Sequence, residues 1–197
     1  MKRRVMAALL CAAVLVSVTA CSCSEDTQGE NGQPTVYTQD PNDRPIPEPE
    51  NPVAQTHNNI GLTDEYLLEM IEDGEIPYDI TNLSLRDNEL TDLTPLAQFR
   101  YLETLNISEN QIVDLKPLSE LKNLKRLIIS GNQIVDLTPL SALDGLMVLE
   151  LQNNEIKDVT PLKDMKLLIR LNLYNNDIDE ETLKELDASM PTTTVLW

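Results

Sequence analysis

The sequence predicts an α/β repeat protein: a short solenoid with a curved parallel sheet inside, 3₁₀ or irregular turns outside, and an N-terminal helical cap. Two observations lead to this fold class. From residue 80 onward, the 197-residue chain falls into rows of 22 residues that share one apolar pattern. The chain is also 41% hydrophobic but only 4% aromatic, which suits thin stacked coils better than a thick globular core.

Charge and composition exclude several classes of function. The chain has 33 acids and 15 bases, a formal net charge of −18, so nucleic acid would be repelled. A single His and three Cys leave too few residues for a zinc site or a Ser-His-Asp triad. We therefore expect no enzyme, no cofactor, no metal and no nucleic-acid partner.

Residues 1–20 have the features of a secretory signal. Three bases, Lys2, Arg3 and Arg4, precede an uncharged, mostly apolar run over residues 5–20. This run is shorter than the roughly 18–20 residues of a comfortable membrane-spanning helix. Small residues at its end complete the pattern of an export signal.

The end of the signal resembles the bacterial lipobox, in the residues Val18-Thr19-Ala20-Cys21. The resemblance implies that Cys21 becomes the mature N-terminus and bears the lipid, placing the protein on the outer face of a bacterial membrane, with the lipid as its only membrane contact. Two alternatives remain: an ordinary signal peptide, and lipidation at Cys23. Removal of residues 1–20 leaves 12 bases and 33 acids, a charge of −21.

A tether and a cap are predicted before the repeats. Residues 21–59 hold six of the twelve prolines and no hydrophobic periodicity, so we expect a disordered acidic spacer, with His57 exposed and unpaired at its end. Residues 60–79 should form a helical cap, with Thr63 as N-cap and an apolar stripe of Leu67, Met70 and Ile71. Gly74 supplies the stop.

Five rows, covering residues 80–189, share the same frame. Apolar residues recur at row positions 1, 4, 6, 11, 14, 17 and 20. Pro stands at position 16 in four rows, where it favours a compact 3₁₀-like return. Position 9 is Asn in every row, and stacked Asn side chains can bond the backbones of neighbouring loops. This predicted Asn ladder consists of Asn88, Asn110, Asn132, Asn154 and Asn176.

The rows resemble leucine-rich repeats, and the motif N-Q-I-V-D-L-x-P-L resembles the internalin type of bacterial surface proteins. The resemblance covers residues 80–197 and implies recognition of a protein partner through the concave sheet. The chain departs from large internalins in having few repeats, which puts host-cell invasion in doubt. A monomer is expected.

The last row lacks Pro and should close the solenoid. Asp179 can cap a short helix over residues 180–188, with Leu183 and Leu186 facing the core. Residues 190–197 should form a closing strand, with Trp197 as a hydrophobic cover rather than a ligand contact.

Row positions 3, 5 and 7 alternate with the core leucines, so their side chains face the concave side and are free to bind a partner. Arg and Tyr are frequent interface anchors. The alternative is a solvated sheet in which Arg126 and Arg170 pair with Glu150. The candidate partner-binding residues are Arg86, Arg126, Ile128, Val148, Glu150, Gln152, Arg170, Asn172 and Tyr174.

Other interpretations stay open at this point. The Asp column at row position 13 favours turn capping, with Ca²⁺ binding as the alternative. A glycan or cell-wall adhesin is the second candidate function, although Tyr174 is the only aromatic residue at the concave positions. Similar 22-residue repeats occur in intracellular phosphatase regulatory subunits, which the export signal opposes. The Asp column consists of Asp92, Asp114, Asp136 and Asp158.

Overall fold

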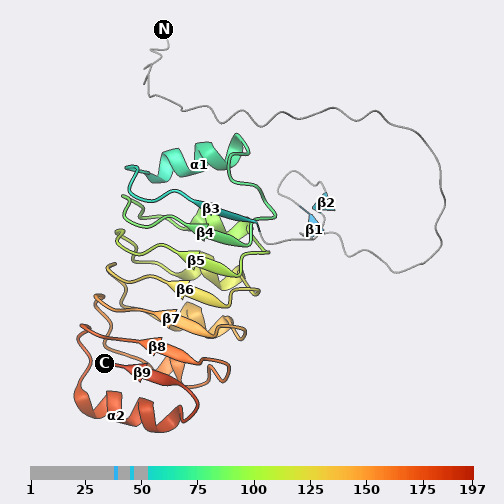
Figure 1. Ribbon diagram of the computed structural model, residues 1–197. Helices are drawn as coiled ribbons and strands as arrows, with labels where there is room; N and C mark the ends of the chain where they lie inside the picture. The colour runs from blue at the N-terminus through green and yellow to red at the C-terminus, as the bar shows by residue number, and fades with distance from the viewer. Residues whose placement is uncertain (1–37, 40–44, 47–52) are drawn as a thin grey trace, which may run out of the picture. The chain divides into compact units, whose positions relative to one another are not determined.

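The computed structural model describes residues 38–39, 45–46 and 53–197 (Figure 1). The predicted signal peptide, Cys21 and most of the predicted tether lie outside these residues. Two short strands, β1 (Thr38–Gln39) and β2 (Pro45–Ile46), pair in antiparallel fashion. Neither helix of the described part has the length and apolar character needed to cross a membrane.

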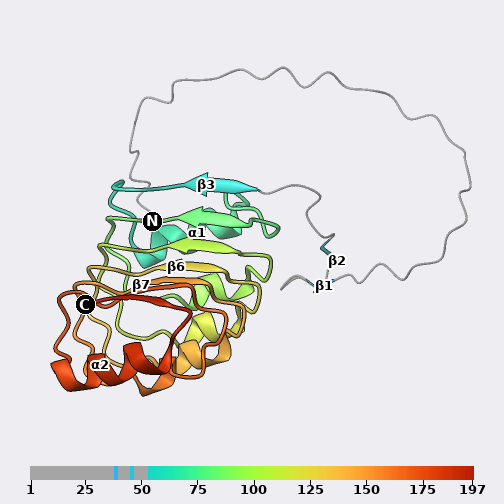
Figure 2. The same cartoon turned by 60° about the horizontal axis from the view of Figure 1, so that its bottom comes forward.

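Seven parallel strands form one curved, open sheet in which they lie side by side in sequence order (Figures 1 and 2). From β4 to β8 each strand pairs with the next at an offset of one row, so that core leucines align across the sheet. This confirms the predicted solenoid. The strands are β3 (Ala54–Thr56), β4 (Asn82–Ser84), β5 (Thr104–Asn106), β6 (Arg126–Ile128), β7 (Val148–Glu150), β8 (Arg170–Asn172) and β9 (Thr194–Leu196).

The sheet begins earlier than the sequence predicted. Strand β3 lies within residues 21–59, which we expected to be disordered, yet it pairs in parallel with β4. Val53 packs against the core, and the Asn58 side-chain oxygen accepts hydrogen bonds from Ser84 Oγ and the Arg86 backbone N–H, both at 2.8 Å. The prediction was wrong here because Gln55 stands opposite Leu83, where a core leucine would be needed for the repeat pattern to be visible.

Helix α1 (Asp64–Glu72) forms in the first coil where the sequence predicts it. The Thr63 hydroxyl accepts a hydrogen bond from the Tyr66 N–H, and Leu67, Met70 and Ile71 are buried. The helix ends just before Gly74, whose φ of +76° is a conformation that glycine adopts without strain. The apolar stripe of α1 thus covers the end of the leucine core.

The outer side of the solenoid consists of short 3₁₀ helices, each with the row-position-16 Pro in its first turn. Each begins after an apolar residue at row position 14 and buries the leucine at position 17. Proline fits here because the first N–H groups of a helix have no intrahelical partner. The elements are η1 (Thr94–Gln98), η2 (Lys116–Glu120), η3 (Thr138–Ala142) and η4 (Thr160–Leu162).

The last coil replaces the 3₁₀ helix with α2 (Glu180–Ser189), which lies beside the final strands in Figure 1. Asp179 caps this helix through a 2.8 Å hydrogen bond from the Thr182 N–H, and Leu183 and Leu186 are buried. Strand β9 follows, with Val195 packed against the core. Trp197 remains exposed, so it does not form the cover that the sequence suggested.

One aliphatic core runs through all the coils. It consists almost entirely of Leu and Ile, and Phe99 is the only large ring that is fully buried among the described residues. Phe99 packs against Tyr78 of the first coil, with 6.2 Å between the ring centroids. Each coil is too thin to bury its own apolar side, so each depends on its neighbours for a core.

Candidate functional site

The candidate site is the concave surface, which we define as row positions 3, 5 and 7 along β4 to β8. The Leu and Ile side chains at positions 4 and 6 point into the core, so the side chains at positions 3, 5 and 7 point to the other side of the sheet. The parallel register places Arg126 beside Val148, and Val148 beside Arg170. In the same way Ile128 lies beside Glu150, and Glu150 beside Asn172.

On β4 and β5 this surface is polar and bonded to itself. Ser84 Oγ donates to the Asn58 side chain at 2.8 Å, and Ser108 Oγ donates to Asn106 Oδ1 at 2.8 Å. Ser108 is itself buried. Short side chains that already have hydrogen-bond partners gain little from a second molecule. Arg86 is exposed here, but no large apolar side chain accompanies it.

From β6 to β8 the side chains of the concave surface are larger and more apolar, and only some of the charged ones form ion pairs. Arg170 Nε lies 2.9 Å from Glu150 Oε1, and the Glu150 side chain is only 14% exposed. The Arg126 guanidinium makes no hydrogen bond or ion pair within the part of the chain that the structure describes. The alternative in which both arginines pair with Glu150 therefore holds for Arg170 alone. Arg126 is left as an exposed cation.

Two further groups in the same region lack partners. Tyr174 is 66% exposed, and its N–H donates to Asn172 Oδ1 at 3.1 Å, which fixes the end of the strand. The side-chain oxygen of Gln152 is buried without a hydrogen bond, alone in this among the described residues. A buried acceptor without a donor is unfavourable, so this amide is a feature that the fold alone does not explain.

The Asn ladder lies at the ends of the strands, where its side-chain amides form hydrogen bonds with backbone groups. Asn110 Oδ1 accepts from the Leu90 N–H at 3.1 Å, while its Nδ2 donates to the carbonyls of Leu85 and Ile107, both at 3.0 Å. Each ladder residue thus joins its own coil to the coil before it. At the first coil Asn88 accepts from the Leu62 N–H and donates to the His57 carbonyl.

His57 is not the exposed, unpaired residue that the sequence suggested. It is half-buried, and its Nε2 lies 3.1 Å from Gln55 Oε1. Burial lowers the pKa of His57, and the charge of Glu75 opposes that shift. The error follows from the same missed strand, because β3 brings this histidine into the first coil.

The Asp column at row position 13 caps the 3₁₀ turns. Each carboxylate accepts a backbone N–H from the residue two positions later, at 2.8 to 2.9 Å. Hydrogen bonds from Thr138 and Thr160, first from the side chain and then from the backbone, lower the pKa of Asp136 and Asp158. The described residues contain no group of three His, Cys, Asp or Glu that could hold a metal ion. The geometry favours turn capping over Ca²⁺.

The structure also exposes apolar residues that the sequence analysis did not single out. Met147 and Ile169 stand at row position 2, where the earlier rows have Thr81, Glu103 and Lys125. This change from polar to apolar is visible in the sequence once the rows are aligned. The exposure of these two side chains is not visible in the sequence, because the row pattern does not define the burial of position 2.

Comparisons with known proteins agree with this architecture. Residues 80–120 and 102–142 match the family described as Leucine Rich repeats (2 copies). The chain is similar to the structure of an internalin, inlF, from Listeria monocytogenes, with 25% identity and a TM-score of 0.52 over 74% of this chain and 47% of that chain. It is also similar to a leucine-rich-repeat protein from Leptospira interrogans, with 25% identity and a TM-score of 0.62 over 74% of this chain and 37% of that chain. The chain spans less than half the length of both structures, and no curated protein matches it.

Proposed function

We propose that this leucine-rich-repeat protein binds a protein partner through the C-terminal half of its concave surface, from β6 to β8. The single observation that supports this site is the concentration of unpartnered groups there. Arg126 is an unpaired cation, Tyr174 is a largely exposed ring, and Gln152 has a buried oxygen without a donor. On β4 and β5, Ser84 and Ser108 are already bonded within the chain, and the one unpaired cation, Arg86, has no large apolar side chain beside it on these two strands.

The chemistry of these groups suits protein recognition. Arg and Tyr contribute disproportionately to binding energy when a partner excludes water from them. Ile128 and Val148 supply a half-buried apolar floor between the polar groups. Glu150 is the only acid on this surface, and it is engaged with Arg170, so no pair of groups is arranged for general acid–base chemistry on the described strands. Leucine-rich-repeat domains are typically non-enzymatic interaction domains, which agrees with this function.

The proposed location is the outer face of a bacterial membrane, with a lipid on Cys21 and a spacer between the lipid and the solenoid. Support comes from the sequence alone, from the basic start, the short apolar run and the lipobox-like residues before Cys21. Metabolic labelling with an alkynyl palmitate tests it. We expect label on the wild-type chain and on Cys23→Ser, and none on Cys21→Ser. Label that survives Cys21→Ser would contradict this anchor.

Affinity capture followed by mass spectrometry tests the concave site. The full chain is compared with Arg126→Ala/Tyr174→Ala, and with Lys116→Ala/Tyr66→Ala as the matched control, since these residues are also an exposed cation and an exposed tyrosine. We expect the concave pair to lose at least about tenfold in capture of a specific protein, and the control to lose little. Equal capture by both variants, or specific binding to a glycan array instead of a protein, would contradict the proposal.

A further inference from the structure

The strongest unexplained feature outside the concave surface is a run of exposed apolar side chains beside β7 and β8. Met147 is 38% exposed, Leu167 59% and Ile169 52%. Two of them lie next to each other at the starts of neighbouring strands, because the Ile169 N–H donates a hydrogen bond to the Met147 carbonyl at 2.8 Å. We call these three residues the apolar edge strip.

The same row position is occupied differently in earlier coils. In the two preceding rows, Glu103 and Lys125 form an ion pair with 2.6 Å between Nζ and Oε1. The surface at the starts of the strands therefore changes at β7, from paired polar side chains to unpaired apolar ones. The concave surface changes in character at the same strands, and the strip adjoins it at the strand starts: Met147 directly precedes Val148, and Ile169 directly precedes Arg170. Because neighbouring side chains of a strand point to opposite faces, the strip lies around the strand starts from the concave surface and not on it.

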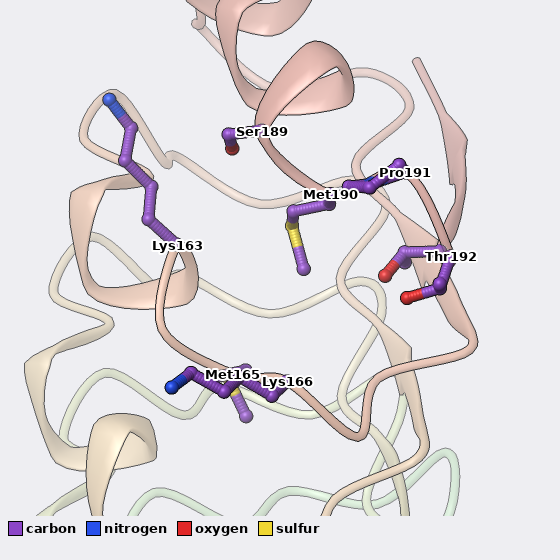
Figure 3. Close-up of a pocket in the computed structure, with 8 residues that line it drawn as sticks. Lys163, Met165, Lys166, Ser189, Met190, Pro191 and Thr192 are labelled. Carbon is purple, nitrogen blue, oxygen red and sulfur yellow. The ribbon is translucent and has the colours of Figure 1, made fainter.

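The strip leads into a shallow pocket of about 160 Å³. The Thr194 N–H donates to the Ile169 carbonyl at 2.7 Å, and the preceding residue, Thr193, lines this pocket together with Lys163 and Lys166. Figure 3 shows both lysines on the segment before β8, with Ser189 to Thr192 on the opposite wall. Neither ammonium lies within hydrogen-bond or ion-pair distance of another described residue, although the charge of Lys163 helps to lower the pKa of Asp158. Two unpaired cations are notable because residues 53–197 hold 26 acids and only 11 bases.

We propose that the partner's binding surface extends around the starts of the strands. An extended segment of the partner, with apolar side chains next to carboxylates, lies on the apolar edge strip and reaches Lys163 and Lys166. This inference rests on the proposed function and names the chemistry of the partner. Charge complementarity selects the occupant: the lysines attract carboxylates, whereas a second copy of this acidic chain would be repelled overall. A segment that passes around the strand starts can contact both surfaces, because Met147 and Val148 are consecutive in the chain.

A library of displayed random twelve-residue peptides, selected on the full chain carrying Cys21→Ser, provides the probe. We expect enrichment of peptides in which Asp or Glu alternates with apolar residues. Their affinity should fall at least tenfold in Leu167→Ser/Ile169→Thr and about threefold in Lys163→Gln/Lys166→Gln, the latter with a weaker salt dependence. Val113→Ser/Val135→Thr is the matched control, because these valines are also exposed and lie outside the strip.

The outcomes separate this inference from the proposed function. Peptides that require Arg126 and Tyr174 but ignore the strip would overturn the inference and leave the concave site standing. Peptides that require neither surface, or no enrichment, would overturn both. A dimer in sedimentation velocity that Ile169→Thr dissociates, or cosedimentation with phosphatidylglycerol vesicles that the same change abolishes, would assign the strip to another occupant and overturn the inference.

Discussion

The coils around β4 and β5 and those from β6 to β8 have the same backbone and different surfaces. Both sets have the same ladder, the same proline turns and the same leucine core. In the first set the concave side chains are polar and, apart from the exposed Arg86, short, with Ser84 and Ser108 hydrogen-bonded within the chain. In the second set they are larger and include apolar residues, and several lack partners. The difference teaches that the buried row positions build the scaffold, while the exposed ones are free to diverge without affecting it.

The largest expected effect tests whether the scaffold is equal in the two regions. Asn110→Ala and Asn154→Ala each remove an amide that bonds three or more buried backbone groups. Because each orphaned group is costly, we expect a loss of about 3 kcal/mol or more in the free energy of unfolding for both. Urea denaturation measures it. A loss of stability in only one variant would show that the Asn ladder does not contribute equally in the two regions.

Gly131 lies at the junction between the two regions, with a φ of +66°. An added Cβ would lie 2.6 Å from the Glu109 carboxyl group, the end of an exposed side chain that can move aside, so Gly131→Ala suffers mainly from left-handed strain. We expect a loss of about 1–2 kcal/mol by thermal or urea denaturation.

Gly145→Ala is the matched control, since its Cβ would meet only backbone atoms at 3.6 Å or more. It should change stability little. Glu109→Ala in the Gly131→Ala background should restore only the part of the loss that comes from the clash. Full restoration would show that the backbone conformation contributes nothing.

At the N-terminal end, Asp64 joins α1 to the next coil. Its carboxylate accepts from the Thr91 N–H at 2.9 Å, the Thr91 hydroxyl at 2.5 Å and the Asp92 N–H at 3.1 Å. We expect Asp64→Ala to cost about 1–2 kcal/mol and to expose the first coil to hydrogen exchange before the last one. Glu65→Ala, on the neighbouring exposed residue, should be nearly neutral. Equal exchange at both ends would contradict this prediction.

Acid should weaken the turns in both regions. Burial alone would raise the pKa of Asp64, but the hydrogen bonds from Thr91 and Asp92 outweigh it and lower that pKa. Hydrogen bonds from Thr138, Thr160 and Thr182 likewise lower the pKa of Asp136, Asp158 and Asp179. Carboxylates with a lowered pKa stabilise the fold above the ordinary value of 3.8, and this contribution disappears as the pH falls below it.

The measurement is the free energy of unfolding between about pH 5 and pH 3, where it should decrease with falling pH. Asp64→Asn should make that decrease shallower. A steeper or unchanged decrease would show that other acids dominate.

The smallest expected effect concerns the C-terminal region. Glu150→Gln removes the partner of Arg170, an ion pair with one largely exposed member, so we expect a loss below about 1 kcal/mol. The freed guanidinium should raise the affinity for acidic peptides by about twofold to threefold, measured by fluorescence anisotropy. Weaker binding would mean that Glu150 itself contacts the partner.

The sequence predicted the coils because the offset between successive strands is 22 residues throughout β4 to β8. Leu, Asn and Pro recur at fixed positions, and each has a physical role that the structure makes explicit in the core, the ladder and the 3₁₀ turns. Strand β3 was missed because Gln55 replaces the diagnostic leucine and the coil that contains α1 is longer than a row.

The partners of exposed side chains could not be predicted. Arg126 and Arg170 stand symmetrically on the strands that flank Glu150, yet only Arg170 pairs with it. Which arginine pairs with Glu150 depends on side-chain rotamers, which the row pattern does not determine. The same holds for the buried oxygen of Gln152, whose lack of a donor appears only when all neighbouring atoms are placed.

The bonding of each ladder asparagine has an evolutionary consequence. Asn132 accepts from the Ile112 N–H and donates to the Ile107 carbonyl, which are the equivalents of the Leu90 and Leu85 groups that Asn110 uses. Deletion of residues 102–123 would therefore bring Asn132 next to acceptors and a donor of the same kind. A gene could lengthen or shorten such a concave surface in steps of about 4.8 Å without changing the contacts between neighbouring coils.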